Sequence, residues 1–238
     1  MKLVWRWLAL CALALLCLQL AFVGRIALMA ALDPQSTAFQ RSEAWRITTE
    51  KGHLPWAHQW APYGQISDNL KRAVIASEDD GFSSHDGVDW DALEKAWAKN
   101  SRAEQRAELR GSSKAPKVVG GSTITQQLAK NLLLSGERNL LRKGQEFVLT
   151  MALEALLSKE RILEIYLNSV EWGEGVFGAE AAAQHYFRKP AARLSGYEAA
   201  RLAVMLPRPK FFEKTPGSAY LSGRAGVIAA RLVDARLP

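Results

Sequence analysis

Residues 77–90 (SEDDGFSSHDGVDW) hold five carboxylates, a histidine and two glycines, a composition suited to acid–base chemistry. Residues 67–76, just before them, start with the good N-cap Ser67 and have a 3.6-residue apolar repeat, which predicts a helix that ends near Glu78. A carboxylate at the end of a rigid element, beside an apolar side chain such as Phe82, is a candidate general base. A solvated acidic loop or a cation-binding turn is the alternative interpretation of the same residues.

A second candidate carboxylate lies in residues 145–157, which are nearly apolar on every face and therefore predict a buried helix. The exceptions recur every four residues and include Glu146 and Glu154. A buried carboxylate costs free energy unless it is paired. We favour a functional role for Glu146, which closely follows Arg142 and Lys143, whereas a structural salt bridge is a sufficient explanation for Glu154.

Polar side chains also concentrate on a predicted helix in residues 120–134 (GGSTITQQLAKNLLL). Thr123 and Gln126 have the spacing of a capping box, and an apolar stripe follows at four-residue intervals. The polar residues at the start and on the other faces are Ser122, Gln126, Gln127, Lys130 and Asn131. Because free amides at a helix N-terminus bind anions, this segment is a candidate for holding an oxyanion or a sugar hydroxyl. A capped surface helix is the simpler alternative.

The first 32 residues predict a membrane anchor. Residues 7–24 carry no charge and would span roughly 27 Å as a helix, close to the thickness of a bilayer core. Lys2 and Arg6 precede this run, so the positive-inside rule places the N-terminus in the cytoplasm and the rest of the chain outside. A cleaved signal peptide is the alternative, but the apolar run exceeds the usual length and no small-residue cleavage site is well placed.

The composition of residues 33–238 is that of an ordinary globular protein domain. The chain of 238 residues has 31 basic residues, of which 3 lie in the first 32 residues, leaving 28 basic against 24 acidic residues. This mildly basic balance does not suggest a nucleic-acid partner. Cys11 and Cys17 both lie in the anchor, so the exported part can have no disulfide, thiol nucleophile or cysteine metal site.

The other patterns predict a mostly helical domain without a β-rich region. Further helices are expected at 90–99, 159–168, 179–187, 195–206 and 220–237. Residues 33–65 form a neck, in which Trp56 and Trp60 are expected to pack against the domain, and residues 111–117 have the composition of a surface loop. We therefore divide the chain into an anchor (1–32), a neck (33–65) and a domain (66–238).

Five blocks of these residues occur in the order found in the peptidoglycan glycosyltransferases of glycosyltransferase family 51, which the chain resembles. The first block has Glu78, Asp79, Phe82, His85 and Gly87; the second is residues 120–132; the third has Arg142, Lys143 and Glu146; the fourth is residues 159–168; and the fifth has Gly175, Gly178, residues 181–183, Tyr186, Phe187 and Lys189. Bifunctional members of the family carry a transpeptidase domain, but this sequence has neither S-x-x-K nor K-T-G. The resemblance is therefore to the monofunctional members.

The resemblance implies a mainly α, lysozyme-like fold with a larger head lobe and a smaller membrane-associated lobe. It implies a single-pass protein of the cytoplasmic (inner) membrane, with the catalytic domain on the periplasmic or outer face. Its substrates would be lipid II as acceptor and a lipid-linked glycan strand as donor. The acceptor GlcNAc 4-hydroxyl would attack donor MurNAc C1 with inversion and release of undecaprenyl pyrophosphate. Membrane lipid and other cell-wall and division proteins are the further partners it suggests.

The resemblance also assigns roles to the candidate residues. Glu78 becomes the general base and Glu146 the second essential carboxylate, which either holds a divalent cation (Mg or Mn) or orients a basic residue. Lys130, Arg138, Arg142 and Lys143 are expected to stabilise the pyrophosphate; Ser122, Thr123, Gln126, Gln127 and Asn131 to contact substrate; and Asp79, Phe82, His85 and Gly87 to support the first block. No organic cofactor is expected.

Two other functions are compatible with parts of the sequence. A lysozyme-like hydrolase would also use a glutamate in a helical domain, but it would need neither an anchor nor a basic pyrophosphate site. A membrane-anchored scaffold that recruits cell-wall enzymes would need no catalysis. Incubation with lipid II separates these alternatives from a polymerase.

Overall fold

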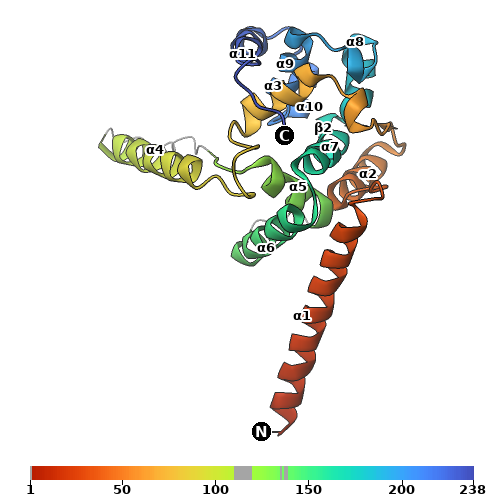
Figure 1. Ribbon diagram of the computed structural model, residues 1–238, viewed down its shortest axis with the longest axis vertical. Coiled ribbons are helices and arrows are strands. Elements are labelled where there is room, and N and C mark those ends of the chain that lie inside the picture. The colour runs from red at the N-terminus through yellow and green to blue at the C-terminus, as the bar shows by residue number, and fades with distance from the viewer. Residues whose placement is uncertain (1, 110–119, 135, 137–138) are drawn as a thin grey trace.

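The computed structural model describes residues 2–109, 120–134, 136 and 139–238, and its first element projects away from the rest (Figure 1). This element, α1 (Lys2–Leu28), is a continuous 27-residue helix that is long and apolar enough to cross a membrane. Ile26, near its C-terminal end, is fully buried where the helix meets the other elements. The predicted anchor is therefore one helix that is exposed over most of its length.

The neck contains a helix that the sequence analysis did not predict, α2 (Ala38–Lys51). A capping box formed by Thr37 and Gln40 starts it, and Gly52, with a φ of 70°, ends it in the left-handed conformation. After α2, the indole of Trp56 stacks on Phe177 with ring centroids 4.6 Å apart. The neck therefore packs against the domain, as expected for Trp56.

One group of helices forms the upper part of the molecule (Figure 1). Here α3 (Asp68–Glu78) packs against α9 (Gly196–Met205), which also packs against α11 (Ala219–Ala230). The alanines of α9 are buried and allow this close packing. The group also includes α8 (Ala179–Phe187), α10 (Pro209–Lys214) and the short 3-10 helix η2 (Ala191–Arg193). This packing holds the C-terminal end of α3 in place.

A second group lies nearer the anchor (Figure 1). It consists of α5 (Ile124–Leu133), α6 (Leu140–Leu156) and α7 (Lys159–Ser169), with α5 packed against both of the others. Helix α6 begins five residues earlier than its apolar run, because Asn139 caps it and the basic residues form its first turns. Gln145 on α6 and Gln19 on α1 exchange two amide hydrogen bonds of 2.8 and 2.9 Å. These bonds connect the anchor to this second group.

The described part of the chain also has a small sheet that the sequence did not predict. Its strand order is β1 (Ala57–His58), β3 (Val176–Phe177) and β2 (Glu171–Gly173), with β1 parallel and β2 antiparallel to β3. Gly175, between β2 and β3, has a φ of 77°, and a Cβ there would lie 2.0 Å from the Pro55 carbonyl oxygen. Strands of two or three residues are too short to show a recognisable alternation of apolar and polar side chains.

Two elements complete the described structure. The 3-10 helix η1 (Tyr63–Gln65) precedes α3, and α4 (Trp90–Leu109) extends sideways from the molecule (Figure 1). The prediction of a mainly helical domain is confirmed. The predicted loop at 111–117 lies outside the described residues.

Candidate active site

Glu78 is the last residue of α3, a helix whose ends and buried face follow from its sequence. Ser67 caps the N-terminus by accepting a hydrogen bond from the backbone amide of Leu70. Val74 and Ile75 are fully buried and fix the orientation of the last turn. The partly buried Glu78 lines a cavity of about 370 Å³ that also includes Ser122. The predicted position of this carboxylate at a rigid helix end is confirmed.

A chain of hydrogen bonds orients the Glu78 carboxylate. Tyr166 is buried, and its hydroxyl donates to Gln127 Oε1 at 2.9 Å. The amide nitrogen of Gln127 then faces the opposite way and donates to Glu78 Oε2 at 3.1 Å. Burial raises the pKa of Tyr166 well above its ordinary value, so the hydroxyl stays protonated and remains a donor. Since the phenol donates to the amide oxygen, it determines which end of the amide meets Glu78.

The electrostatic setting of Glu78 favours a proton acceptor rather than a permanent charge. Burial is the largest influence and raises the pKa of Glu78 above 4.5, and the nearby Asp79 raises it further. Hydrogen bonds from Gln127 and Ser77 lower it and partly oppose burial. A carboxylate with a pKa moved toward neutrality is a stronger base than an ordinary surface glutamate.

Asp79 connects the first sequence block to α5. Its Oδ2 accepts a 2.9 Å hydrogen bond from the backbone amide of Ile124, the first residue of α5, where the helix dipole favours a carboxylate. Its Oδ1 is 2.8 Å from His85 Nε2. Because the amide of Gly87 donates to His85 Nδ1 at 3.1 Å, Nε2 carries the proton and donates to Asp79. His85 therefore orients Asp79, as predicted.

Gly87 and Phe82 complete this support. Gly87 has a φ of 85°, and a Cβ there would lie 2.8 Å from both Thr150 Cγ2 and Glu154 Cγ, so no other residue fits. The fully buried ring of Phe82 packs under the ammonium of Lys159, 4.6 Å from the ring centroid. Lys159 also forms a 2.8 Å ion pair with Glu154, which confirms the structural interpretation of Glu154.

Glu146 is buried on α6 in a very different setting. Only 3% of this residue is exposed, and Arg142 Nη1 lies 2.9 Å from its Oε2. The ammonium of Lys143 contacts its other oxygen, Oε1. Both cations come from the preceding turn of the same helix, so the third sequence block forms a local ion-pair cluster.

This donor set is a poor fit for a divalent cation, because both oxygens of Glu146 already accept hydrogen bonds from cations. Mg²⁺ and Mn²⁺ prefer several oxygen ligands, commonly from carboxylates and water. Within the described ranges, no group of three or more His, Cys, Asp or Glu side chains is placed to hold a metal ion. The described arrangement instead fits a carboxylate that orients two basic residues.

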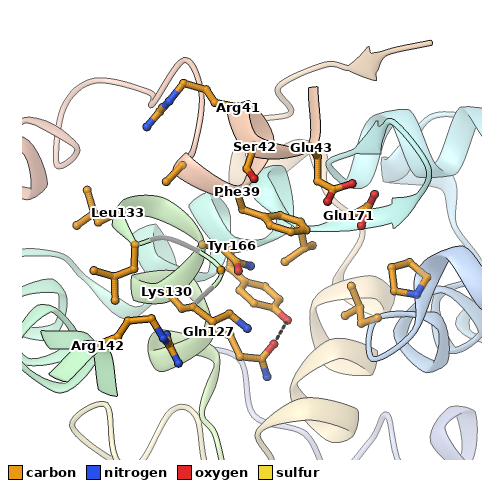
Figure 2. Close-up of a pocket in the computed structure, with 17 residues that line it drawn as sticks. Phe39, Arg41, Ser42, Glu43, Gln127, Lys130, Leu133, Arg142, Tyr166 and Glu171 are labelled. Atoms are coloured by element: carbon orange, nitrogen blue, oxygen red, sulfur yellow. Dashed lines mark hydrogen bonds between the residues drawn. The ribbon is translucent and has the colours of Figure 1, made fainter. Parts of the chain in front are cut away.

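A larger cavity of about 640 Å³ is lined in part by Gln127 (Figure 2). It is lined by side chains from α2, α5, α6, α7 and β2. Lys130 and Arg142 lie on one side in Figure 2, and Glu43 and Glu171 lie on the other. Gln127 lines this cavity while it contacts Glu78, which lines the smaller one. The candidate base therefore lines the smaller cavity and is connected to the larger one through Gln127.

Comparison with known proteins assigns this site to a family. A family model described as transglycosylase matches residues 48–233, which is most of the chain. The chain belongs to the transglycosylase family. It is 55% identical over 237 residues to a biosynthetic peptidoglycan transglycosylase of Burkholderia thailandensis, covering 98% of this chain and 88% of the relative. It is also 54% identical over 225 residues to the protein of the same description in Burkholderia lata, covering 94% and 87% of the two chains. The predicted family is confirmed, and with it the lysozyme-like fold.

In this transglycosylase, the predicted substrate contacts fall into three sets. Lys130, Asn131 and Arg142 line the larger cavity, whereas Ser122 lies in the cavity of Glu78. Lys143 is half exposed beside Glu146, and Arg138 lies outside the described residues.

Thr123 and Gln126 form the third set, because their polar atoms are engaged within the transglycosylase itself. Thr123 also lines the cavity of Glu78. They form the capping box of α5, and the Thr123 hydroxyl also donates to the Gly87 carbonyl oxygen at 2.7 Å. The structure therefore gives both a structural role, and their contact with substrate stays a prediction.

The sequence analysis missed residues that the fold of the transglycosylase brings to the site. Tyr166 fits the apolar stripe of α7, and nothing in that pattern indicates that its hydroxyl reaches Gln127. Glu43 comes from the unpredicted helix α2, and Glu171 from the unpredicted sheet. The signal available for Glu171 was an acid between the apolar residues Val170 and Trp172.

Proposed function

We propose that this transglycosylase is a peptidoglycan polymerase that joins lipid II units into glycan strands for the bacterial cell wall. The observation that carries the proposal is a base candidate, Glu78, that lines one cavity and accepts a hydrogen bond from Gln127, which lines a second cavity. The relatives from Burkholderia, which are named biosynthetic peptidoglycan transglycosylases, support the substrate class. A polymerase needs two substrate sites that meet at one reacting centre, and this arrangement supplies them.

In the proposed reaction, Glu78 removes the proton from the acceptor GlcNAc 4-hydroxyl. The oxygen forms a bond to donor MurNAc C1 while the bond from C1 to the pyrophosphate oxygen breaks. Undecaprenyl pyrophosphate leaves with the electron pair, and a single displacement converts the α linkage into a β linkage. A sugar hydroxyl is a weak nucleophile near neutral pH, so the raised pKa of Glu78 suits this step.

We assign the lipid-linked donor to the larger cavity because its cations can neutralise a pyrophosphate. Arg41, Lys130 and Arg142 line this cavity. Pyrophosphate is already a good leaving group, so fixed positive charge contributes more to its departure than a strong acid would. Glu146 then acts through Arg142 and Lys143 by holding both cations in position. The acceptor is assigned to the smaller cavity beside Glu78.

The anchor places this chemistry at a membrane. We propose that α1 crosses the cytoplasmic membrane once with its N-terminus inside, because Lys2 and Arg6 precede the apolar run. The domain then lies outside, where lipid-linked substrates would reach it from the bilayer. Membrane lipid and other cell-wall and division proteins are the proposed partners, and no transpeptidase activity is expected.

The test is incubation of the purified full-length protein with lipid II in detergent or in vesicles. We expect glycan polymer and released undecaprenyl pyrophosphate, without any added protein. Shortening of preformed glycan without polymer formation would instead support the hydrolase alternative. The absence of any reaction from a folded preparation would support the scaffold alternative. Repeating the assay with EDTA and with added Mg²⁺ or Mn²⁺ tests the proposed, but poorly fitting, divalent cation.

A further inference from the structure

A compact charged cluster forms one wall of the larger cavity, opposite its cationic side. Glu43 and Glu171 both line the cavity, and Figure 2 shows their carboxylates next to each other. Lys210 on α10 lies between them: its ammonium contacts Glu43 Oε2 and is 3.4 Å from Glu171 Oε1. The two acids come from α2 and β2, so three separate elements converge on this wall.

Glu171 is the least satisfied member of this cluster. The residue is only 8% exposed, and its Oε1 is buried without a hydrogen-bond partner. Lys210 is near that atom, but its ammonium is engaged by Glu43. Because Glu171 lines the cavity, its carboxylate lies where a ligand in the cavity can contact it. An under-hydrogen-bonded buried carboxylate favours binding of a group that brings donors.

The charge of the wall indicates which donors these are. The cluster and its attached ion pairs contain four carboxylates, Glu43, Glu50, Glu171 and Glu174, against three cations, Arg46, Lys51 and Lys210. This net negative charge disfavours an anion such as a phosphate. Burial, together with the nearby Glu43, raises the pKa of Glu171 to about 7, so additional negative charge there is already costly. A neutral hydroxyl donor satisfies the wall without adding charge.

We propose that Glu171 binds a saccharide hydroxyl of the lipid-linked substrate and positions its sugar in the larger cavity, with Glu43 and Lys210 holding Glu171 in place. This inference rests on the proposed function and adds a sugar-binding wall to it. The pyrophosphate would lie on the side of Lys130 and Arg142, and the sugar on the side of Glu171 (Figure 2). Glu43 precedes the segment that the family model matches, residues 48–233, so in this proposal the neck helix α2 supports the sugar-binding wall from outside that segment.

The test compares the substrate with a product that has no sugar. Glu171→Met keeps the length of the side chain and removes its hydrogen bonds, whereas Glu171→Gln keeps hydrogen bonding. We expect Glu171→Met to raise the KM for the lipid-linked glycan donor, measured at a fixed concentration of lipid II, by about 10-fold or more, as for loss of a hydrogen bond to a charged group. The inhibition constant of undecaprenyl pyrophosphate should not change, and Glu171→Gln should stay within a few-fold of the wild type. Such a split is not expected from a merely structural residue.

Glu174→Gln is the matched control, because Glu174 pairs with Arg46 and Lys51 in the same network but does not line the cavity. Its KM for the lipid-linked glycan donor should equal that of the wild type. If Glu171→Met does not fold, Glu171→Ala replaces it, since truncation adds no bulk to the cavity wall. An unchanged KM in Glu171→Met, or an equal rise in the KM and in the inhibition constant of undecaprenyl pyrophosphate, would overturn the sugar contact. In that case, polymerisation by the wild type would still support the proposed function. No polymerisation by the folded wild type would overturn both.

Discussion

Glu78 and Glu146 are both glutamates on helices, yet the structure gives them opposite surroundings. Glu78 ends α3, receives a hydrogen bond from the neutral amide of Gln127, and faces a cavity. Glu146 lies within α6, is only 3% exposed, and contacts two cations. Burial raises the pKa of Glu78. The comparison shows that one residue type lies beside a neutral amide at one position and beside two cations at another.

The position along each helix explains the difference. Side chains three and four residues apart share a face, so Arg142 and Lys143 reach Glu146 from the preceding turn. The corresponding positions before Glu78 are Val74 and Ile75, which are apolar and fully buried. No cation on α3 can therefore reach Glu78 in the same way, and the amide that contacts it, from Gln127, comes from another helix.

The largest effect expected is from Glu78→Gln, which removes the base but keeps the size of the side chain. Polymerisation of lipid II should fall by about 10³-fold or more, since general-base catalysis contributes on this scale. The thermal unfolding temperature of the variant should stay close to that of the wild type. Near wild-type polymerisation by a folded Glu78→Gln variant would show that Glu78 is not the base, so Glu78 and Glu146 would no longer differ in the proposed way.

Glu146→Gln should instead reduce both activity and stability. The substitution leaves Arg142 and Lys143 without their shared carboxylate, and breaking a buried ion pair costs roughly 3–5 kcal/mol of stability. We expect about a 10²-fold loss of polymerisation, of the size seen when charge stabilisation is lost, together with a lower unfolding temperature. High activity with unchanged metal dependence would contradict both a cation-binding and an orienting role for Glu146.

Glu171 is a third buried glutamate for this comparison. The cation beside it, Lys210, is shared with Glu43. Its pKa rises from 4.5 to about 7 on folding, so ionisation between these values destabilises the folded state. Stability from this group is present below pH 4.5 and is lost as the pH rises through 7, by up to about 3 kcal/mol. Glu171→Gln should flatten the pH dependence of the unfolding temperature over this window. An identical slope in the variant and the wild type would contradict the raised pKa.

The smallest expected effect concerns the amide that contacts Glu78. The hydrogen bond from Gln127 lowers the pKa of Glu78, so Gln127→Ala should raise that pKa further. Since the ionised form is the base, the acidic limb of kcat/KM should move to higher pH. Asn131→Ala, which lines the larger cavity, is the control and should leave the limb in place. Both variants should be measured in proteins that also carry Glu171→Gln, which removes the titration of Glu171 near neutral pH. An acidic limb that moves to lower pH in Gln127→Ala would contradict the assignment of this limb to Glu78.

Much of the helical framework could be predicted because its apolar faces repeat regularly. The ends of α3, α5, α7 and α8 lie close to the predicted ones, and each shows a cap or a breaker in the sequence. Helix α2 was missed because it buries Gln40 and Glu43 along with Ile47, so its core-facing side is not an apolar stripe. The capping box at Thr37 and Gln40 was the available signal.

The sequence by itself determined where the candidate carboxylates lie on their helices, because caps, helical periods and local charge pairs act over a few residues. The position of Glu78, the pairing of Glu146 and the anchor all follow from such short spacings. Only the tertiary structure decided what contacts Glu78 and Glu171. Tyr166 and Gln127 are 39 positions apart, and Glu43 and Lys210 are 167 positions apart. Their contacts depend on how the helices pack, which the period of a single helix does not encode.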